Sequence, residues 1–242
     1  TVTINAAFEC LDFNMDGPAS GKVTWAGTST MGVYGNLNLT GGSSKITRTY
    51  SGTLSMKATS GTKNITTNGA TLRNFTINGS GGTFVPQDDL WIDANAATFT
   101  LSRSAGTFNA NGKVVYIRNC YAGTISGFNG TSTNRFYDLD ILGLASQQTR
   151  ISMGDRQGMN IANKLTAKGQ APGSTYDNSR LLIHTSKTGT ISGPYTLNAA
   201  VVEAEYLDIG GFTVGGGANW DLSSIPGGCG NVGGNVGITF TT

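Results

Sequence analysis

The stretch TNGATLRNFTINGSGGTF, from Thr67 to Phe84, alternates short apolar runs with Gly, Asn, Ser and Thr. Three apolar residues in it are expected to be buried: Leu72, Phe75 and Ile77. Asn68-Gly69 and Gly79–Gly82 are typical of sharp corners, because Gly and Asn adopt positive φ at low cost. The stretch therefore predicts one coil of short strands joined by tight corners. It contains no conventional catalytic signature.

The same texture extends over all 242 residues. Hydrophobic residues make up 38% of the chain, which is enough for a core, whereas charged residues make up 12%, about half of the roughly 25% usual in soluble domains. Thr, Val, Ile, Phe and Tyr favour strands, and 36 glycines favour turns. The net charge of +2 is scattered, so no basic run suggests a nucleic-acid partner. No apolar stretch approaches the roughly 20 residues that span a bilayer, and no signal peptide is visible. The strand-like start TVTIN suggests a processed chain or a piece of a longer one.

A loose repeat indicates the architecture. Each expected strand contains one apolar anchor that should point inward: Leu11, Leu37, Leu54, Phe75, Leu90, Val114, Leu139, Leu165, Leu182, Leu207 and Ile238. The ten steps from the first anchor to the last average about 23 residues. Repeats of this length indicate solenoids, whereas a propeller blade needs about 40 to 45 residues and a leucine-rich repeat needs a Leu/Asn frame that is missing. The sequence predicts an all-β, single-stranded parallel β-helix with coils of about 20–25 residues. An immunoglobulin-like pair of sandwiches is the competitor, and it would favour hairpins every 8 to 12 residues.

The chain divides into a body and a terminal segment. Residues 1–209 are expected to form the β-helix, with polar loop excursions at residues 146–160 and 168–180. Residues 210–242 are very rich in Gly and are interpreted as a terminal cap or assembly segment, with Trp220 as a plug for the last coil. The best helix candidate is Gly158–Lys168, although it alternates well enough to be a strand.

Candidates for chemistry are few. A glycosidase usually needs two carboxylates beside a cleft, and the pairs Asp88 with Asp89 and Asp138 with Asp140 are the candidates. A turn or solvated-strand role is the favoured interpretation of both pairs. His184 is the only histidine, so it cannot form a two-histidine metal site, and no GxSxG elbow accompanies it. Stacked Asp and Asn suggest calcium, but the nonapeptide pattern of calcium-binding β-rolls is absent. We therefore expect no catalytic, metal or cofactor-binding residue.

Other side chains have competing interpretations. The three cysteines are odd in number and far apart, and they are expected to be free buried thiols, with one disulfide as the alternative: Cys10, Cys120 and Cys229. Four aromatic residues are candidates for exposed glycan contacts, although such residues more often fill a core or a cap: Trp25, Tyr34, Trp91 and Tyr121. Four glycosylation sequons are expected by chance in a chain this rich in Asn and Thr: Asn38, Asn64, Asn74 and Asn129.

Several motifs resemble those of phage-encoded and metagenomic structural proteins. They are, in chain order, the opening TVTINAAFECLDFNM, GNLNLTG (Gly35–Gly41), NITTNGATL (Asn64–Leu72), GGTFVPQDDL (Gly81–Leu90) and GGNVGITF (Gly233–Phe240). The resemblance covers most of the chain and implies a β-solenoid module of a virion structural protein, such as a tail fibre, spike or capsid decoration. Large bacterial surface proteins contain similar modules. The excursions at residues 146–160 and 168–180 depart from this pattern, and they are candidates for particle-specific contacts.

The expected function is therefore structural. We expect a non-enzymatic virion protein, a rigid β-helix displayed on the outside of a phage particle that mediates assembly or attachment. The alternatives are a bacterial cell-surface adhesin module and a polysaccharide-degrading β-helix enzyme. The expected partners are other virion or surface proteins and further copies of the chain, paired end to end through TVTIN and GITFTT. Host-surface glycans are a further candidate, whereas nucleic acid and membrane insertion are not expected.

Overall fold

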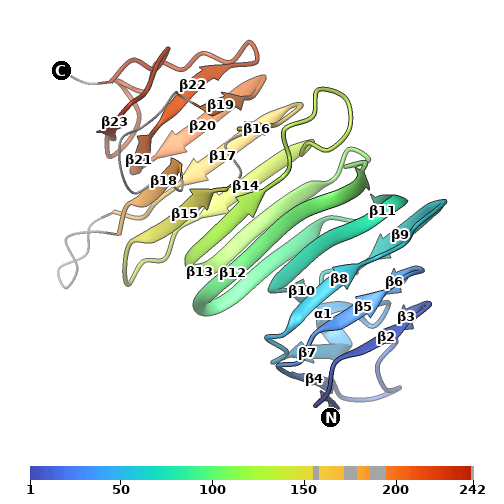
Figure 1. Cartoon of the computed structure of the whole chain (residues 1–242). Helices are drawn as coiled ribbons and strands as arrows, with labels where there is room; N and C mark the ends of the chain where they lie inside the picture. The colour runs from blue at the N-terminus through green and yellow to red at the C-terminus, as the bar shows by residue number, and fades with distance from the viewer. Residues whose placement is uncertain (155–157, 172–178, 186–194, 241–242) are drawn as a thin grey trace.

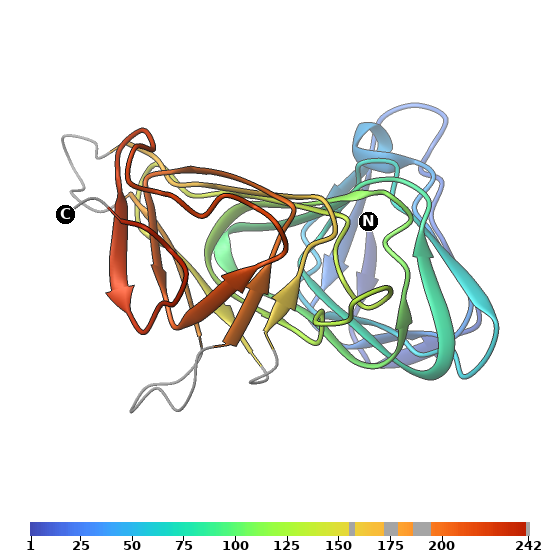
Figure 2. The same cartoon turned by 90° about the horizontal axis from the view of Figure 1, so that it is seen from above.

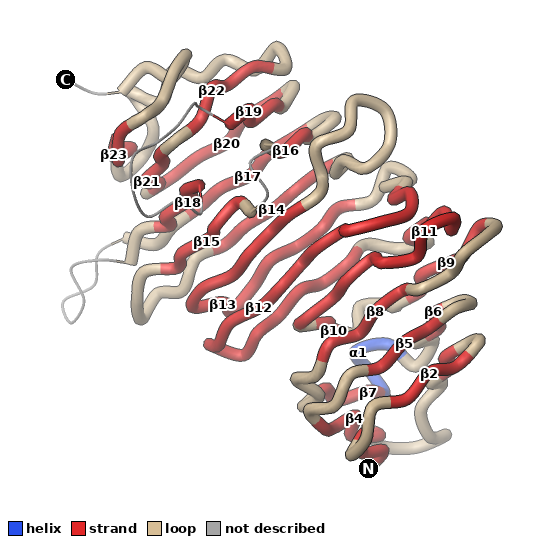
Figure 3. Tube along the Cα trace, viewed as in Figure 1, coloured by secondary structure: helices blue, strands red, loops and turns tan. Residues whose placement is uncertain are grey.

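The chain forms a parallel β-solenoid. The computed structural model describes all residues except 155–157, 172–178, 186–194 and 241–242. It is nearly all β, with 57% strand and 2% helix, and its stacked coils make about nine turns from the N-terminus to the C-terminus (Figures 1 and 3). Seen from above, the first and last coils lie at opposite ends of the molecule (Figure 2). The predicted parallel β-helix is confirmed.

Three sheets contain the strands of the described residues. Two of them have three strands each: β1 (Val2–Ile4), β4 (Val23–Gly27) and β7 (Ile46–Arg48) in one, and β16 (Met159–Asn160), β19 (Tyr195–Asn198) and β22 (Phe212–Gly215) in the other. The third sheet has 17 strands and wraps around the solenoid: β2 (Phe8–Cys10), β3 (Phe13–Asn14), β5 (Met31–Val33), β6 (Leu37–Asn38), β8 (Thr53–Met56), β9 (Thr62–Thr66), β10 (Thr71–Leu72), β11 (Asn74–Pro86), β12 (Leu90–Phe108), β13 (Val114–Ser126), β14 (Asp138–Leu142), β15 (Thr149–Met153), β17 (Lys164–Lys168), β18 (Leu181–Thr185), β20 (Val201–Glu205), β21 (Leu207–Gly210) and β23 (Cys229–Gly233). The single described helix is the one-turn α1 (Gly42–Lys45).

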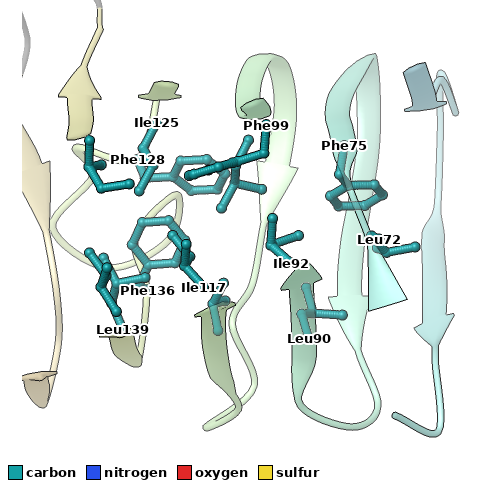
Figure 4. Packing of buried hydrophobic residues seen from close by; sticks show 14 of the residues in the cluster. Leu72, Phe75, Leu90, Ile92, Phe99, Ile117, Ile125, Phe128, Phe136 and Leu139 are labelled. Carbon is teal, nitrogen blue, oxygen red and sulfur yellow. The ribbon is translucent and has the colours of Figure 1, made fainter. Parts of the chain in front are cut away.

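Apolar side chains stack inside the coils in register. One such row, the inner ladder, consists of paired residues from five successive coils: Leu72, Ile92, Ile117, Ile141 and Ala167. All five are buried, and Figure 4 shows neighbouring members of this core between the strands. Parallel strands lie about 4.8 Å apart, so each inward side chain contacts its counterparts in the coils above and below. Burial of this continuous core holds the coils together, because no single coil buries its own apolar face.

Corners form where the sequence predicts them. Asn68 and Gly69 have φ values of 48° and 79°, the left-handed conformation that Asn and Gly tolerate. Gly79–Gly82 lies within β11, between the residues that pair with β8 and those that pair with β9, so the chain bends there without leaving the strand. A Cβ on Gly81 would overlap the carbonyl oxygen of Thr59, so glycine is required for this close approach of two coils.

Amide and carboxylate side chains tie neighbouring coils together at the outside. Asp12 Oδ1 accepts a hydrogen bond from the backbone N–H of Asn36 at 2.5 Å, and Asn36 Oδ1 accepts one from the N–H of Asn64 at 2.9 Å. Asn64 Oδ1 then accepts from Gln87 Nε2 at 3.0 Å. This row crosses four successive coils and satisfies backbone donors at a corner, where the regular ladder is interrupted. Carboxylate and amide side chains thus form a continuous row up this outer face.

Three of the predicted inward anchors are wrong. Leu11 is 71% exposed at a corner of the first coil. Val114 and Leu182 are half-buried, and the neighbouring Val115 and Leu181 occupy the core instead. For Val114 and Leu182 the reason is the two-residue period of a strand: a shift of one residue moves a side chain to the opposite face. Leu11 lies between β2 and β3, outside any strand.

The loop predicted at residues 146–160 is also wrong in part. Thr149–Met153 forms β15, with Thr149, Ile151 and Met153 buried in alternation, and Met159–Asn160 forms β16. Polar residues on the outer face of β15 made this stretch look like a loop. The candidate helix at Gly158–Lys168 consists of β16 and β17. Residues 155–157 of this stretch lie outside the described residues, as does most of the excursion at residues 168–180.

The Gly-rich segment from residue 210 is hydrogen-bonded to the coils before it. Within it, β22 pairs with β19 and β23 pairs with β21, both in parallel. Trp220 is buried, and its indole N–H donates to the carbonyl oxygen of Gly215 at 3.1 Å. The side chain of Arg180 donates to the carbonyl oxygens of Gly227 and Gly228 and so links this segment to the body.

Candidate functional sites

Asp88 and Asp89 lie at a corner and bind backbone groups. The Asp88 carboxylate accepts hydrogen bonds from the N–H of Thr67 at 3.0 Å, from Thr67 Oγ1 at 3.1 Å and from the N–H of Asn68. Asp89 Oδ1 accepts from the N–H of Val114 at 2.9 Å. The first carboxylate thus binds the coil before it and the second binds the coil after it. This arrangement connects coils and does not aim two carboxylates at one external ligand.

Asp138 and Asp140 share a face, as the strand period predicts, but each has its own structural partners. Asp138 Oδ1 accepts from Asn163 Nδ2 and from the N–H of Lys164, both at 2.8 Å. Asp140 Oδ1 forms an ion pair with Arg118 Nη2 at 3.0 Å. Bonds of this kind hold the carboxylates against the neighbouring coils. A glycosidase pair would instead have to face a shared cleft.

Arg118 connects an aromatic stack on the same outer face. The rings of Trp91 and Tyr116 stack with centroids 4.2 Å apart, and the Arg118 guanidinium lies 4.9 Å from the Tyr116 centroid and 5.8 Å from that of Trp91. Burial raises the pKa of the Tyr116 hydroxyl, and the nearby carboxylates of Asp89 and Asp140 raise it further. Cation–π and stacking contacts stabilise this outer face.

The other aromatic candidates differ in exposure. Trp25 is only 1% exposed and stacks on Tyr50, so it fills the core, the more common of the two roles considered for it, and is not available for a glycan contact. It occupies the inner face of β4 and also packs against the ring of Phe13. Tyr34 donates its hydroxyl to Glu9 Oε2 at 3.0 Å, and Tyr121 is 41% exposed.

Two of the four sequon asparagines use their side-chain nitrogen to bridge coils. Asn38 Nδ2 donates to Asn14 Oδ1 at 2.6 Å, and Asn74 Nδ2 donates to the carbonyl oxygen of Ser51 at 2.8 Å. A glycan on either nitrogen would break these bonds. Asn64 is exposed and Asn129 is partly buried.

His184 and Arg150 line a groove on the outer face of the large sheet. We call it the Arg150 groove. It consists of two adjoining hollows of about 320 and 360 Å³ that share these two residues. The first hollow extends over β18, β21 and β23, and the second extends over β12, β13 and β15. Each volume is at the lower end of the range of ligand sites, roughly 300–1,000 Å³. Arg150 lies within the stretch of residues 146–160 that the sequence marks as a candidate for contacts, but no motif in the sequence identifies it as a site residue.

The three cysteines are free. Cys120 is fully buried and its thiol donates to the carbonyl oxygen of Arg118 at 2.8 Å. Burial raises the pKa of the Cys120 thiol from 9.0 to about 12, and burial has the same effect on the pKa of Cys229. A thiol with so high a pKa is a poor nucleophile at neutral pH, so Cys120 and Cys229 are structural.

The raised pKa of Cys120 predicts a loss of stability in alkaline solution. Below pH 9 the thiol is neutral in both states and its contribution is fully present; between pH 9 and 12 it ionises only in the unfolded chain. The free energy of unfolding should therefore fall with a slope of at most about 1.4 kcal/mol per pH unit from this group. Urea titrations of the wild type and Cys120→Ala from pH 7 to 11 measure the difference in slope. Equal slopes above pH 9 would contradict the prediction.

The described residues contain no cluster of three or more His, Cys, Asp or Glu side chains able to hold a metal ion. In the same part of the chain, no helix has the length and apolar character needed to cross a bilayer. Comparisons of the chain with models of protein families, with curated proteins and with solved structures find no match. Function must therefore be argued from this chain's own geometry.

Proposed function

We propose that this protein is a non-enzymatic structural module. It is a rigid rod displayed on the outside of a phage particle, where it positions its outer faces and ends for assembly or attachment. The resemblance of its motifs to those of virion structural proteins supports the location, and the solenoid supports the mechanical role.

One observation carries the mechanical part of the proposal: the cross-coil bonding runs the length of the described chain. Paired parallel strands lead from β2 in the first coil to β23 in the last. Polar side chains on the outside add a second set of bonds between coils, as the row from Asp12 to Gln87 shows. A rod whose outer polar groups bind its own backbone resists bending and local opening.

The carboxylates favour a rod over an enzyme. Both candidate pairs, at Asp88 with Asp89 and at Asp138 with Asp140, accept bonds from backbone N–H groups or from Arg118. A catalytic acid or base must reach the reacting atoms of a substrate. Carboxylate oxygens that bridge coils are directed at the protein's own donors instead.

The first coil favours assembly. β1, β2 and β3 each pair with a later coil on one edge, and in the described residues no strand lies on the other edge. Val2 and Leu11 are exposed beside these edges. Unpaired edges with apolar neighbours invite pairing with another chain or module, and this is the end-to-end contact that we propose.

Electron microscopy with a gold-labelled antibody against the purified protein tests the proposed location. We expect label on intact phage particles that encode the chain, at one defined position. Label on the bacterial envelope in the absence of particles would instead support the adhesin, which shares the rod and differs in its anchor.

A turnover assay tests the non-enzymatic part. The purified protein is incubated with capsular polysaccharide, lipopolysaccharide and plant uronans, and reducing ends are counted. We expect no release above background, and Asp138→Asn/Asp140→Asn should behave as the wild type does. Release by the wild type that the double variant loses would overturn the proposal in favour of a polysaccharide-degrading enzyme.

A further inference from the structure

The Arg150 groove follows the solenoid axis across successive coils. Paired residues on its floor form a row of small hydroxyl side chains, the hydroxyl row: Thr100, Thr124 and Ser152. The next residue of the same row is His184. Each coil adds about 4.8 Å, close to the length of one sugar ring in an extended chain. The groove therefore repeats its hydrogen-bonding groups at a spacing that suits a linear polymer of polyhydroxylated units.

The small side chains in the second hollow leave room for a ligand. Ala122 and Gly123 line it beside Thr124, and their paired residues in the next coil, Arg150 and Ile151, are larger. The ring of Phe99 fills the space inside Gly123, so the floor is closed from below. The result is a shallow polar trough over a packed core.

Arg150 differs from most arginines of this chain. Five others donate to backbone carbonyl oxygens and so tie coils or corners together: Arg48, Arg73, Arg103, Arg118 and Arg180. Arg150 is exposed, and within the described residues its guanidinium bonds only the Gln148 side chain, at 2.9 Å. Most of its five donors therefore remain available to a ligand.

His184 adds a second group of defined orientation. Its Nδ1 lies 2.8 Å from the carbonyl oxygen of Thr185, which only accepts, so Nδ1 carries the hydrogen. Nε2 is then the nitrogen left for a ligand, and in the neutral ring it accepts a hydrogen bond from a hydroxyl group.

The charge of the groove selects the ligand. Among the described residues that line the two hollows, Arg150 is the permanent charge and there is no carboxylate. Asp208, in the next coil, pairs with the lining residue Leu182, and Arg180 forms an ion pair with Asp208 at 2.7 Å. An anionic ligand is therefore attracted, and a planar carboxylate matches the guanidinium fork.

We propose that the Arg150 groove binds an acidic polysaccharide, with the chain lying along the solenoid axis. Arg150 binds a uronic-acid carboxylate, the hydroxyl row binds ring hydroxyl groups, and His184 Nε2 accepts one more. This inference rests on the proposed function, because it names the ligand class for the attachment role, and it requires binding without cleavage.

Calorimetric titration with a galacturonate hexamer tests the proposal, with a neutral galactose hexamer as the control ligand. The wild type should bind the acidic hexamer and bind the neutral one at least tenfold more weakly. Arg150→Gln should weaken binding of the acidic hexamer about tenfold, the effect expected of one charge-assisted hydrogen bond. Ser152→Tyr should abolish binding by filling the trough, and circular dichroism verifies that both variants fold.

Arg135→Gln is the matched control variant. Arg135 also lines two hollows, one with Tyr137 and one with Asn160, and neither hollow shares a lining residue with the Arg150 groove. This variant should bind the acidic hexamer as the wild type does. Equal losses in the Arg135 and Arg150 variants would show non-specific attraction and overturn the proposal, as would wild-type affinity in Arg150→Gln or tighter binding of a polyglutamate peptide. Cleavage of the hexamer would instead overturn the non-enzymatic function and leave the groove assignment standing.

Discussion

Phe136→Ala is expected to lower the free energy of unfolding by about 3–5 kcal/mol, the range for removing a fully buried aromatic side chain. Phe136 is 0% exposed, and its ring stacks on that of Phe128 with centroids 4.5 Å apart. Phe108 packs edge-on against Phe128 at 5.4 Å. Figure 4 shows Phe128 and Phe136 facing each other inside the coil. The two stacked residues flank the loop of residues 129–135, so their contact also closes the loop.

The loss in Phe136→Ala should be local as well as global. In a repeat protein, the total stability is close to a sum of the stability of each repeat and the contacts between neighbouring repeats. A coil that loses its packing therefore weakens the contact between the coils on either side of it. Denaturant unfolding measures the total loss of stability. Hydrogen exchange compares the variant with the wild type, and the substitution should accelerate exchange more in β13 and β14 than in β8. Tyr137→Ala is the matched control, because the next side chain is 40% exposed and points outward. A loss below about 1.5 kcal/mol, or an equal loss in the control, would contradict the role of the cluster.

The coil period and the corners were predictable from the sequence. Both depend on local signals: an apolar residue about every 23 positions, and Asn or Gly where φ is positive, as at Asn68. Val114 and Leu182 were misplaced because the same local signals do not fix the face of a short strand, whereas Leu11 was misplaced because it lies at a corner between β2 and β3. The neighbouring Val115 and Leu181 are equally apolar, and only pairing with the adjacent coils decides which residue points inward.

The groove was not predictable, because its residues meet through coil lengths that vary. Ser152 pairs with Thr124 of the coil before it, 28 positions earlier, and with His184 of the coil after it, 32 positions later. Regular coils of 23 residues would have placed other side chains beside Ser152. The role of Arg150 was hidden for the same reason, since an exposed arginine on a polar strand has no distinguishing local pattern.

The carboxylates show how a sequence pattern suggests two roles that only contacts can separate. A pair such as Asp138 and Asp140 is compatible with catalysis and with a solvated strand. The structure adds the bonds to Lys164 and Arg118, which connect coils. Backbone donors at corners need an acceptor once the ladder is interrupted, and Asp and Asn provide one within reach.

Asp88→Ala is expected to destabilise the fold by about 3 kcal/mol, because hydrogen bonds to a charged acceptor contribute roughly 1.5–3 kcal/mol each and do not add fully. The carboxylate accepts from both the N–H and the hydroxyl of Thr67 and from the N–H of Asn68, and Thr67 is fully buried. Truncation leaves the N–H groups of Thr67 and Asn68 without their acceptor at the corner between two coils, whereas the Thr67 hydroxyl can still donate to the carbonyl oxygen of Asp89 at 3.2 Å. Asp88→Asn keeps one oxygen acceptor and should lose less, about half as much.

Urea unfolding at pH 7 measures both Asp88 variants beside Glu203→Ala, the matched control. Glu203 forms only an exposed ion pair with Lys164 at 3.3 Å, so its removal should cost less than about 1 kcal/mol. For a carboxylate that connects coils, the free energy of unfolding should increase in the order Asp88→Ala, Asp88→Asn, wild type. A catalytic carboxylate would instead be replaced with little loss of stability. A stable Asp88→Ala variant would contradict the structural role. It would also return the pair of Asp88 and Asp89 to the candidates for acid–base chemistry.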